Sequence, residues 1–285
     1  IDEAFAAMVE VDRLMSNYRD DSELARVNLE AARGAVPVSA PLFAVLTAAE
    51  RVSRQSNGAF DVTIGPAMVL WGFHDRRPHL PTPAELAAIR PLVDYRTVLL
   101  DPARSTVRVT RPGISIDLGG IAKGFAVELG AGVVRRHGLS GFIDAGGNQY
   151  MVGTPVGKKT WTVGVKSPDA KDRLLGVLEL GEGSVSTSAD YSNFMVVDGV
   201  AYGHVLDPRT LKPASASLSV TIVSVDGTMA DAMSKAAFIL GPKAGLALVD
   251  AFPGMSAIIA YRQPDGRIGL AISDALKSRF TPAVR

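Results

Sequence analysis

The stretch from 116 to 125, Ile-Asp-Leu-Gly-Gly-Ile-Ala-Lys-Gly-Phe, holds the residues best suited to bind an anion. Gly119-Gly120 lets the backbone turn sharply and leaves two amides unobstructed by side chains. A helix that begins after such a turn presents free N–H groups and the positive end of its dipole. Lys123 adds a full charge, and Asp117 can hold a ribose hydroxyl, a ring N–H or a metal-bound water. The alternative is a plain strand–helix junction with a surface lysine.

Hydrophobic spacing predicts the elements on either side of this turn. Ile114, Ile116 and Leu118 alternate with polar residues, which is the period of a half-buried strand. After the glycines, apolar residues recur at helical spacing, at Ala122, Phe125, Ala126, Leu129 and Val133. The glycines do not form a GxGxxG fingerprint, and no acidic residue ends a second strand about 20 residues later, so a Rossmann NAD site is a poor fit.

Other polar stretches follow apolar runs and are further candidates for a site. They lie at 58–66, 184–191 and 203–210, and Asp231 opens a predicted helix near Met229. Loops on a rigid scaffold are where binding and catalytic residues usually lie. We therefore expect these stretches to contribute side chains to one site.

Each of these candidates also has a purely structural interpretation. Asp61, with Thr63, can bind the edge of a ligand or cap a turn. Thr187 and Ser188 offer two hydroxyls to a phosphate, although an ST-turn is the favoured interpretation. His204 can act as a general acid or base near pH 7. The alternative is that it is a hydrogen-bonded core residue or a surface residue, as a lone histidine in a strand more often is.

The last two candidates are acidic. Asp207-Pro208-Arg209-Thr210 has the pattern of a type I turn, which favours a turn role for Asp207 over a catalytic one. Arg209 can pair with a phosphate or with Asp207. Asp231 can simply interact favourably with the dipole at the start of its helix. However, a carboxylate, backbone carbonyls and phosphate are also a common ligand set for Mg²⁺.

Composition excludes several classes of function. The net charge is +1 and aromatic residues make up 6 %, so neither a strong field nor a stacking platform indicates nucleic acid or an anionic membrane as partner. The absence of cysteine excludes disulfides, thiolate nucleophiles and Cys-ligated metals. No run of about 18 apolar residues predicts a transmembrane span. HExxH, GxSxG and P-loop motifs are absent, and no zinc spacing joins the four histidines, His74, His79, His137 and His204.

The pattern of elements favours an α+β fold. Strands arrive in antiparallel-looking clusters with helices between the clusters, which argues against a doubly wound parallel sheet. Helices are predicted over 1–15, 41–55, 83–90, 121–137, 229–240 and 243–251. Strands are predicted over 96–100, 105–110, 114–118, 142–145, 149–153, 160–166, 173–180, 217–224, 256–261 and 267–271, with a hairpin at 197–200.

A series of motifs runs through nearly the whole chain. They are Met15-Ser16-Asn17-Tyr18 with Ser22 and Asn28; Asn57-Gly58-Ala59-Phe60-Asp61-Val62-Thr63-Ile64-Gly65-Pro66 with Leu70-Trp71-Gly72-Phe73; Asp117-Leu118-Gly119-Gly120-Ile121-Ala122-Lys123-Gly124; Asp144-Ala145-Gly146-Gly147; Thr187-Ser188; His204-Val205-Leu206-Asp207-Pro208-Arg209-Thr210; and Ala230-Asp231-Ala232-Met233-Ser234. In this order they resemble the ApbE family of flavin transferases (FAD:protein FMN transferases). The resemblance implies one T-fold-like α+β domain over 1–285, with largely antiparallel sheets and an FAD cleft between its two halves.

The resemblance also implies a reaction. FAD is bound with Mg²⁺, a Thr or Ser hydroxyl of a target flavoprotein attacks the FMN-side phosphorus, and AMP leaves. Such a transfer needs a cradle for the pyrophosphate, a cation and a base near the hydroxyl. A periplasmic or exported bacterial location is implied as well, although the family's export and lipid-attachment segment is missing before Ile1.

The resemblance assigns roles to individual residues. Those expected to contact the flavin or adenosine portion are Tyr18, Ala59, Phe60 and Asp61. Those expected to hold the ligand and the metal beside the Gly-Gly turn are Asp117, Lys123 and, through its carbonyl, Gly120. Those expected to line the phosphate and target side are Thr187, Ser188, His204 and Val205. Asp231 is the expected acidic metal ligand, and His204 and Asp231 are the catalytic candidates.

This sequence departs from the family pattern at three positions. Lys235 stands where a Thr that also binds Mg²⁺ is usual, one helical turn after Asp231, so its ammonium can occupy the place of the cation. Ala189 and Leu211 stand where glycines are usual. Two alternatives to transfer therefore stay open: an FAD-binding carrier or accessory protein with weak or no Mg²⁺-dependent transfer, and a hydrolase that splits FAD into FMN and AMP.

Overall fold

A six-stranded antiparallel sheet forms the centre of the molecule. The structure is a computed structural model that describes residues 1–170, 172–189 and 194–283. The strands lie in the order β15 (Ile268–Ile272), β14 (Ser256–Arg262), β13 (Ser219–Ser224), β8 (Gly183–Ala189), β5 (Asn148–Val152) and β4 (Gly141–Ala145). Every neighbouring pair in this sheet is antiparallel. The predicted α+β class is therefore confirmed.

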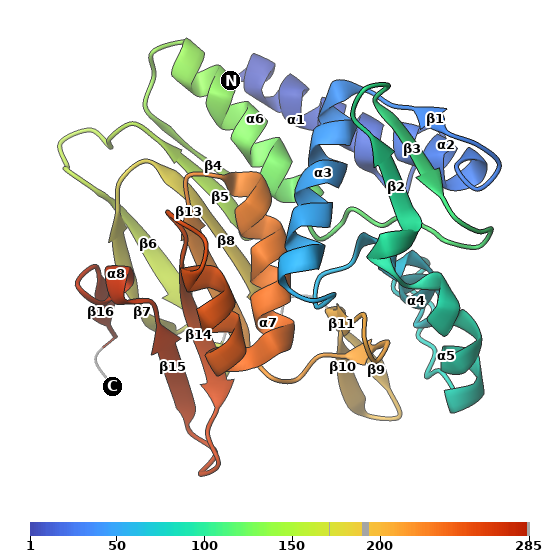
Figure 1. Cartoon of the computed structure of the whole chain (residues 1–285). Coiled ribbons are helices and arrows are strands. Elements are labelled where there is room, and N and C mark those ends of the chain that lie inside the picture. Colours follow the sequence, from blue (N-terminus) through green and yellow to red (C-terminus); the bar gives the residue numbers. More distant parts are fainter. Residues whose placement is uncertain (171, 190–193, 284–285) are drawn as a thin grey trace.

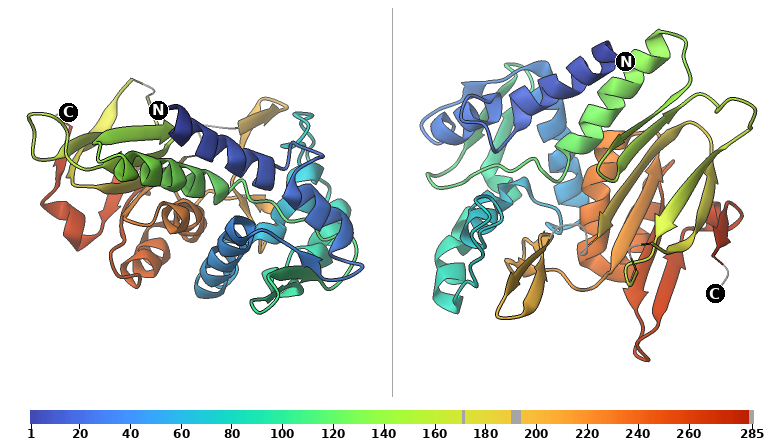
Figure 2. Two further views of the ribbon diagram at one scale, coloured as in Figure 1. Left: turned by 90° about the horizontal axis from the view of Figure 1, so that it is seen from above. Right: turned by 180° about the vertical axis from the view of Figure 1, so that it is seen from behind.

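The two faces of this sheet are covered differently (Figure 1). Helices α6 (Ala122–Arg136) and α7 (Gly227–Asp250) pack on one face, and α1 (Asp2–Met15) and α3 (Ala40–Gln55) pack on these two helices. A second apolar cluster joins the other face to the three-stranded sheet of β6 (Trp161–Lys166), β7 (Leu174–Leu180) and β16 (Phe280–Pro282). The view from above in Figure 2 shows α1 lying along α6.

The central helix α7 is interrupted where the sequence predicts. Gly241 has φ 78° and ψ −176°, and Pro242 follows it, so the helical path breaks there. By length and composition alone α7 would pass as a membrane span, because an 18-residue window has a mean hydropathy of 1.3. However, 56 % of that window is buried inside the protein, as expected of a helix at the centre of a core.

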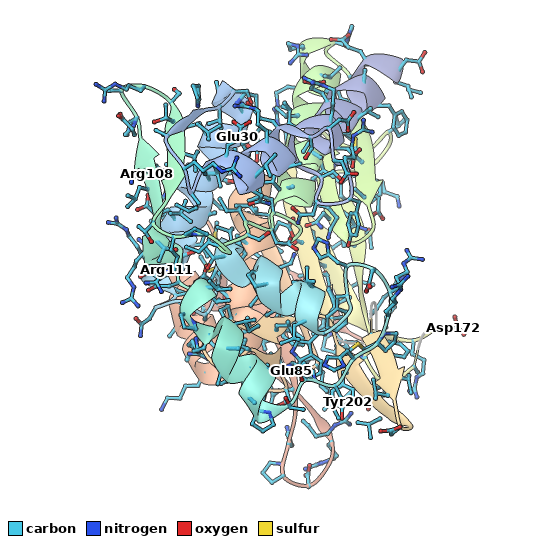
Figure 3. All side chains as sticks on the ribbon, turned by 90° about the vertical axis from the view of Figure 1, so that its right-hand side faces the viewer. Glu30, Glu85, Arg108, Arg111, Asp172 and Tyr202 are labelled. Atoms are coloured by element: carbon cyan, nitrogen blue, oxygen red, sulfur yellow. The ribbon has the colours of Figure 1, made fainter. Side chains whose placement is uncertain are left out.

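The remaining elements build the N-terminal part and one hairpin region. A small sheet and its helices comprise α2 (Glu23–Glu30), β1 (Val36–Pro37), α4 (Gly65–Leu70), α5 (Pro83–Ile89), β2 (Val98–Asp101) and β3 (Thr106–Val109). Beside them lie β9 (Phe194–Val197), β10 (Val200–Gly203), β11 (Leu206–Asp207) and β12 (Lys212–Pro213). The short helix α8 (Asp274–Lys277) lies on the opposite side of the molecule, next to β14 and β16. In Figure 3, Tyr202 of β10 lies at the end of the molecule that carries α5, and Arg108 lies on the outer side of β3.

Local signals placed several boundaries correctly. The side chain of Thr82 forms a capping box with Glu85 at the start of α5. Asp198 and Gly199 both have positive φ, which is the turn that the predicted hairpin at 197–200 requires.

The predicted strand at 114–118 is wrong. Its burial alternates as expected, with Ile114, Ile116 and Leu118 buried, but the segment belongs to no sheet. The side chain of Asn28 takes the place of a strand partner: its amide donates to the carbonyl of Ile116 at 2.9 Å and accepts from the N–H of Ile116 at 2.7 Å. Asp117 N–H donates to the carbonyl of Val62 at 2.7 Å. These bonds hold the extended backbone that leads into the Gly-Gly turn.

The ST-turn favoured at Thr187 and Ser188 is wrong as well, because both residues lie in a strand. Residues up to Ala189 form the central strand β8, which pairs with β13 and β5, while Asp190 and Tyr191 lie outside the described residues. The polar side chains are accommodated because they find partners inside the fold; Ser186 Oγ, for example, donates to Asn148 Oδ1 at 2.6 Å.

Candidate functional site

A cleft of about 410 Å³ is lined by residues that lie between 8 and 126 and between 204 and 239 in the sequence. From the first part of the chain, the end of α1 with the following turn, the segment from Ala59 to Phe73, and the Gly-Gly turn with the start of α6 line this cleft. From the later part, the segment from His204 to Pro208 and Lys235 of α7 line it. The lining includes the predicted residues Tyr18, Ala59, Phe60, Asp61, Asp117, Gly120, Lys123, His204, Val205 and Lys235. Segments that are distant in sequence thus converge on one cavity.

The Gly-Gly turn brings a lysine to the cleft, but several of the N–H groups that the sequence predicts to be free are already bonded. The N–H of Ala122 donates to the carbonyl of Leu118 at 2.9 Å, and the N–H of Gly124 donates to Asp231 Oδ2 at 2.8 Å. The N–H of Gly119 donates to Asp117 Oδ1 at 2.7 Å, and Lys123 Nζ donates to the carbonyl of Gly119 at 3.4 Å. A Cβ atom on Gly120 would lie 3.1 Å from Phe60 Cε2, so a side chain at Gly120 would crowd the cleft. The turn therefore brings bare backbone and one ammonium group to the N-terminus of α6.

Asp117 forms a hydrogen bond with His74, a residue that the sequence does not predict for the site. His74 Nε2 lies 3.1 Å from Asp117 Oδ2. The ring of His74 stacks on Tyr18, with centroids 5.3 Å apart and an interplanar angle of 28°. The hydrogen bond to Asp117 raises the pKa of His74, against the opposing effect of its burial. His74 thus links two residues that line the cleft, Tyr18 and Asp117.

We expect the stability from the His74–Asp117 pair to decrease as pH rises. Because Asp117 raises the pKa of folded His74 above its unfolded value of 6.5, the pair stabilises the fold fully below that pH. This stability is lost as pH rises through the folded-state pKa. The loss of melting temperature caused by His74→Gln should therefore be larger at pH 5.5 than at pH 8.5. An equal loss at both values would show that the imidazole does not gain charge in this contact.

Asp231 and Lys235 form a buried ion pair behind the turn. Asp231 is 0 % exposed and the Lys235 side chain is 14 % exposed. One carboxylate oxygen of Asp231 contacts the Lys235 ammonium, and the other accepts from the N–H of Gly124 at 2.8 Å. Burial lowers the pKa of Lys235, while Asp231 opposes that shift. Because Ile121 has no capping side chain, Asp231 of α7 caps α6 in its place.

This arrangement does not fit the expected magnesium site. Mg²⁺ requires oxygen ligands in near-octahedral geometry. Both oxygens of Asp231 already accept from nitrogen donors, and an ammonium group stands at the expected second side-chain ligand. Within the described ranges 1–170, 172–189 and 194–283, no three His, Asp or Glu side chains converge on a metal position. We therefore derive no chemical step through a metal ion.

Asp61 lines the cleft but also has a structural role. Its Oδ1 accepts from the N–H and hydroxyl of Thr63 at 2.8 and 2.7 Å, and its Oδ2 accepts from the N–H of Tyr95 at 2.8 Å. Burial raises the pKa of Asp61, and these hydrogen bonds oppose the increase. The carboxylate thus caps the short helical turn after it and holds the Tyr95 loop, as the structural alternative expects.

Thr187 and Ser188 are adjacent in β8, so their side chains point to opposite faces of the sheet. The hydroxyl of Ser188 lies 2.7 Å from that of Ser234 on α7, and the hydroxyl of Thr187 lies 3.0 Å from that of Thr221 on β13. Neither residue is in the lining of the cleft, so the structure does not bring this pair together at one phosphate position.

A model of the ApbE family matches residues 1–259. The chain belongs to the ApbE family. Among similar curated proteins, the FAD:protein FMN transferase of Treponema pallidum is 33 % identical over 94 % of this chain and 78 % of its own length. The FAD:protein FMN transferase of Vibrio cholerae is 32 % identical over 85 % of this chain and 73 % of its own length.

Solved structures of ApbE proteins have the same fold. The crystal structure of the Thermotoga maritima ApbE protein matches with a TM-score of 0.88 at 33 % identity, covering 98 % of this chain and 90 % of that one. The flavin transferase ApbE from Vibrio cholerae matches with a TM-score of 0.86 at 29 % identity, covering 98 % and 89 %.

Two departures from the ApbE pattern are accommodated inside the fold. Leu211, where a glycine is usual, has φ 60°, a conformation that favours glycine, and is fully buried. Its carbonyl accepts from Trp71 Nε1 at 2.8 Å, so the bond and the burial hold this unfavourable conformation. Ala189 is buried at the end of β8.

Other parts of the ApbE motifs have visible structural roles. Asp207 accepts from the N–H and side chain of Arg209 at 2.9 Å each, which is the turn role expected of it. Asn17, which also lines the cleft, has a buried side-chain oxygen with no hydrogen-bond partner among the described residues. Periodicity carries no signal for His74 or Asn17. Asn17 belongs to the Met15-Ser16-Asn17-Tyr18 motif, and His74 directly follows the Trp71-Gly72-Phe73 motif, which is the only signal that the sequence offers for it.

Proposed function

We propose that this protein transfers the FMN moiety of FAD to a Thr or Ser hydroxyl of a target flavoprotein and releases AMP. The observation that carries the proposal is the single cleft that joins the Gly-Gly turn, two lysines and apolar walls in a chain of the ApbE family. Relatives about a third identical over most of this chain are named FAD:protein FMN transferases.

The residues of the cleft support binding of the pyrophosphate and of a flat ring of FAD. The turn at Gly119-Gly120, with the ammonium of Lys123, suits the negatively charged pyrophosphate. Phe60 and Ala59 supply an apolar wall for a flat ring, and Tyr18 supplies an exposed aromatic face. The unpartnered oxygen of Asn17 would accept a hydrogen bond from a ligand N–H or O–H.

The transfer step forms and breaks one bond to phosphorus. The acceptor oxygen bonds to the FMN-side phosphorus, the bond from that phosphorus to the bridging oxygen breaks, and AMP leaves with the bridging oxygen. His204, in the cleft lining, is our candidate to receive the hydroxyl proton. The Lys123 ammonium stabilises the charge that develops on the phosphates.

An FAD-binding carrier or accessory protein is the second candidate function. It is favoured by the contact of Lys235 with Asp231, which occupies the expected metal position. Hydrolysis is the third, since water can replace the acceptor hydroxyl. By family membership we also infer that the target is an exported or membrane-associated bacterial flavoprotein.

The test is an incubation of the protein with FAD and an acceptor flavoprotein domain, with and without Mg²⁺. Transfer predicts a fluorescent, flavin-labelled acceptor band and one AMP per label, and a Thr→Ala acceptor should stay unlabelled. AMP with free FMN would indicate hydrolysis. Bound FAD without any product, while an active ApbE relative labels the same acceptor, would contradict the transferase proposal and support the carrier.

A further inference from the structure

The positive charge at the inner end of the cleft comes from lysine side chains. Lys235 lines the cleft, and its ammonium is anchored by Asp231, which the N–H of Gly124 holds in turn. The Lys235 side chain is only 14 % exposed, so it has little freedom to leave this position. The charge is therefore preorganised before any ligand arrives.

Lys235 also lies directly against the Gly-Gly turn. A Cβ atom on Gly120 would lie 3.9 Å from Lys235 Cγ, so the lysine stem runs beside the Gly-Gly turn. Lys123, whose ammonium donates to the carbonyl of Gly119 at 3.4 Å, is near enough for its charge to act on Lys235. The ammonium groups of Lys123 and Lys235 thus both lie near the Gly-Gly turn. The carboxylate of Asp231 neutralises only that of Lys235.

We propose that the Lys235 ammonium replaces a divalent cation at the pyrophosphate, so that this protein binds and uses FAD without a metal ion. The inference rests on the proposed function for its ligand. An ammonium on the face of α7 nearest the turn supplies one positive charge where a divalent cation would supply two, Lys123 adds a second, and neither can be removed by a chelator. The same ammonium excludes Mg²⁺ by repulsion and by occupying the carboxylate.

The wild-type protein gives the first test. FAD is titrated into it in EDTA and again in excess Mg²⁺, with the quenching of flavin fluorescence as the readout. We expect the two dissociation constants to agree within roughly twofold, since the Lys235 ammonium already occupies the expected metal position beside Asp231.

Lys235→Thr should convert the site to metal dependence. In EDTA its affinity for FAD should fall roughly tenfold or more, because a charge-assisted contact to phosphate is lost. Mg²⁺ should restore most of that affinity, since Asp231 and the new hydroxyl can then act as oxygen ligands. Lys243→Thr, at an exposed position of the same helix, should behave like the wild type in both buffers.

The outcomes separate this inference from the proposed function. Metal-independent FAD binding by the wild type, with metal-dependent binding by Lys235→Thr, supports the inference whether or not transfer occurs. Wild-type binding or transfer that EDTA abolishes and Mg²⁺ restores overturns it and leaves the transferase proposal intact. Unchanged affinity of Lys235→Thr in EDTA also overturns it. If Lys235→Thr fails to fold, as judged by circular dichroism, the wild-type titration decides.

Discussion

Asp231→Asn is expected to lower the free energy of unfolding by about 3–5 kcal/mol, which would be the largest effect of any single polar substitution proposed for this protein. The change leaves the Lys235 ammonium without its counter-charge at a site where the carboxylate is 0 % exposed. It also replaces the charged acceptor that caps α6 at Gly124 with a neutral one. Urea unfolding followed by circular dichroism measures the loss.

A double variant separates the lost charge pairing from general damage. Asp231→Asn combined with Lys235→Met removes both charges, and a neutral pair of similar volume is often as stable as the buried ion pair that it replaces. The double variant should therefore recover most of the stability that the single variant loses. A single variant that loses less than about 1 kcal/mol would contradict a charged, buried pair.

Gly124→Ala is expected to destabilise the protein by about 3 kcal/mol or more, at the upper end of the usual cost of overpacking. A Cβ atom there would lie 2.1 Å from the carbonyl oxygen of Gly227 and 2.6 Å from Asp231 Cβ. Both contacts are at the crossing of α6 and α7, and backbone atoms cannot swing aside as a side chain can. The helices must separate, which also moves Asp231 away from the helix that it caps.

Gly132→Ala is the matched control, because it makes the same change in the same helix. The atom nearest to its Cβ is Arg136 Nη1 at 3.8 Å, so there is room for the methyl group. Helix propensity alone then predicts a gain of up to about 1 kcal/mol. Thermal melting should move in opposite directions for the two variants. A stabilising Gly124→Ala would show that the two helices do not meet as closely as the structure has them.

The cleft residues could be predicted to the extent that they lie in short motifs. The sequence predicts the Gly119-Gly120 turn and the helix after it, because glycines and helical spacing are local signals. His74 was not predicted, because its partner Asp117 lies 43 residues away and nothing near His74 indicates the contact. The ST-turn predicted at Thr187 and Ser188 is wrong, because the two hydroxyls have partners in the sheet and on α7 that no local pattern indicates.

The sequence by itself determined the helix ends, the turns, the α+β class and the family resemblance, because caps, glycines and hydrophobic periods act within a few residues of chain. Only the tertiary structure decided that 114–118 pairs with the Asn28 side chain, that 183–189 is a central strand, and that Asp231 caps a helix 107 residues earlier. Each of these depends on where distant segments of backbone meet. The packing of the whole core determines which distant segments come into contact, and no local sequence pattern predicts these contacts.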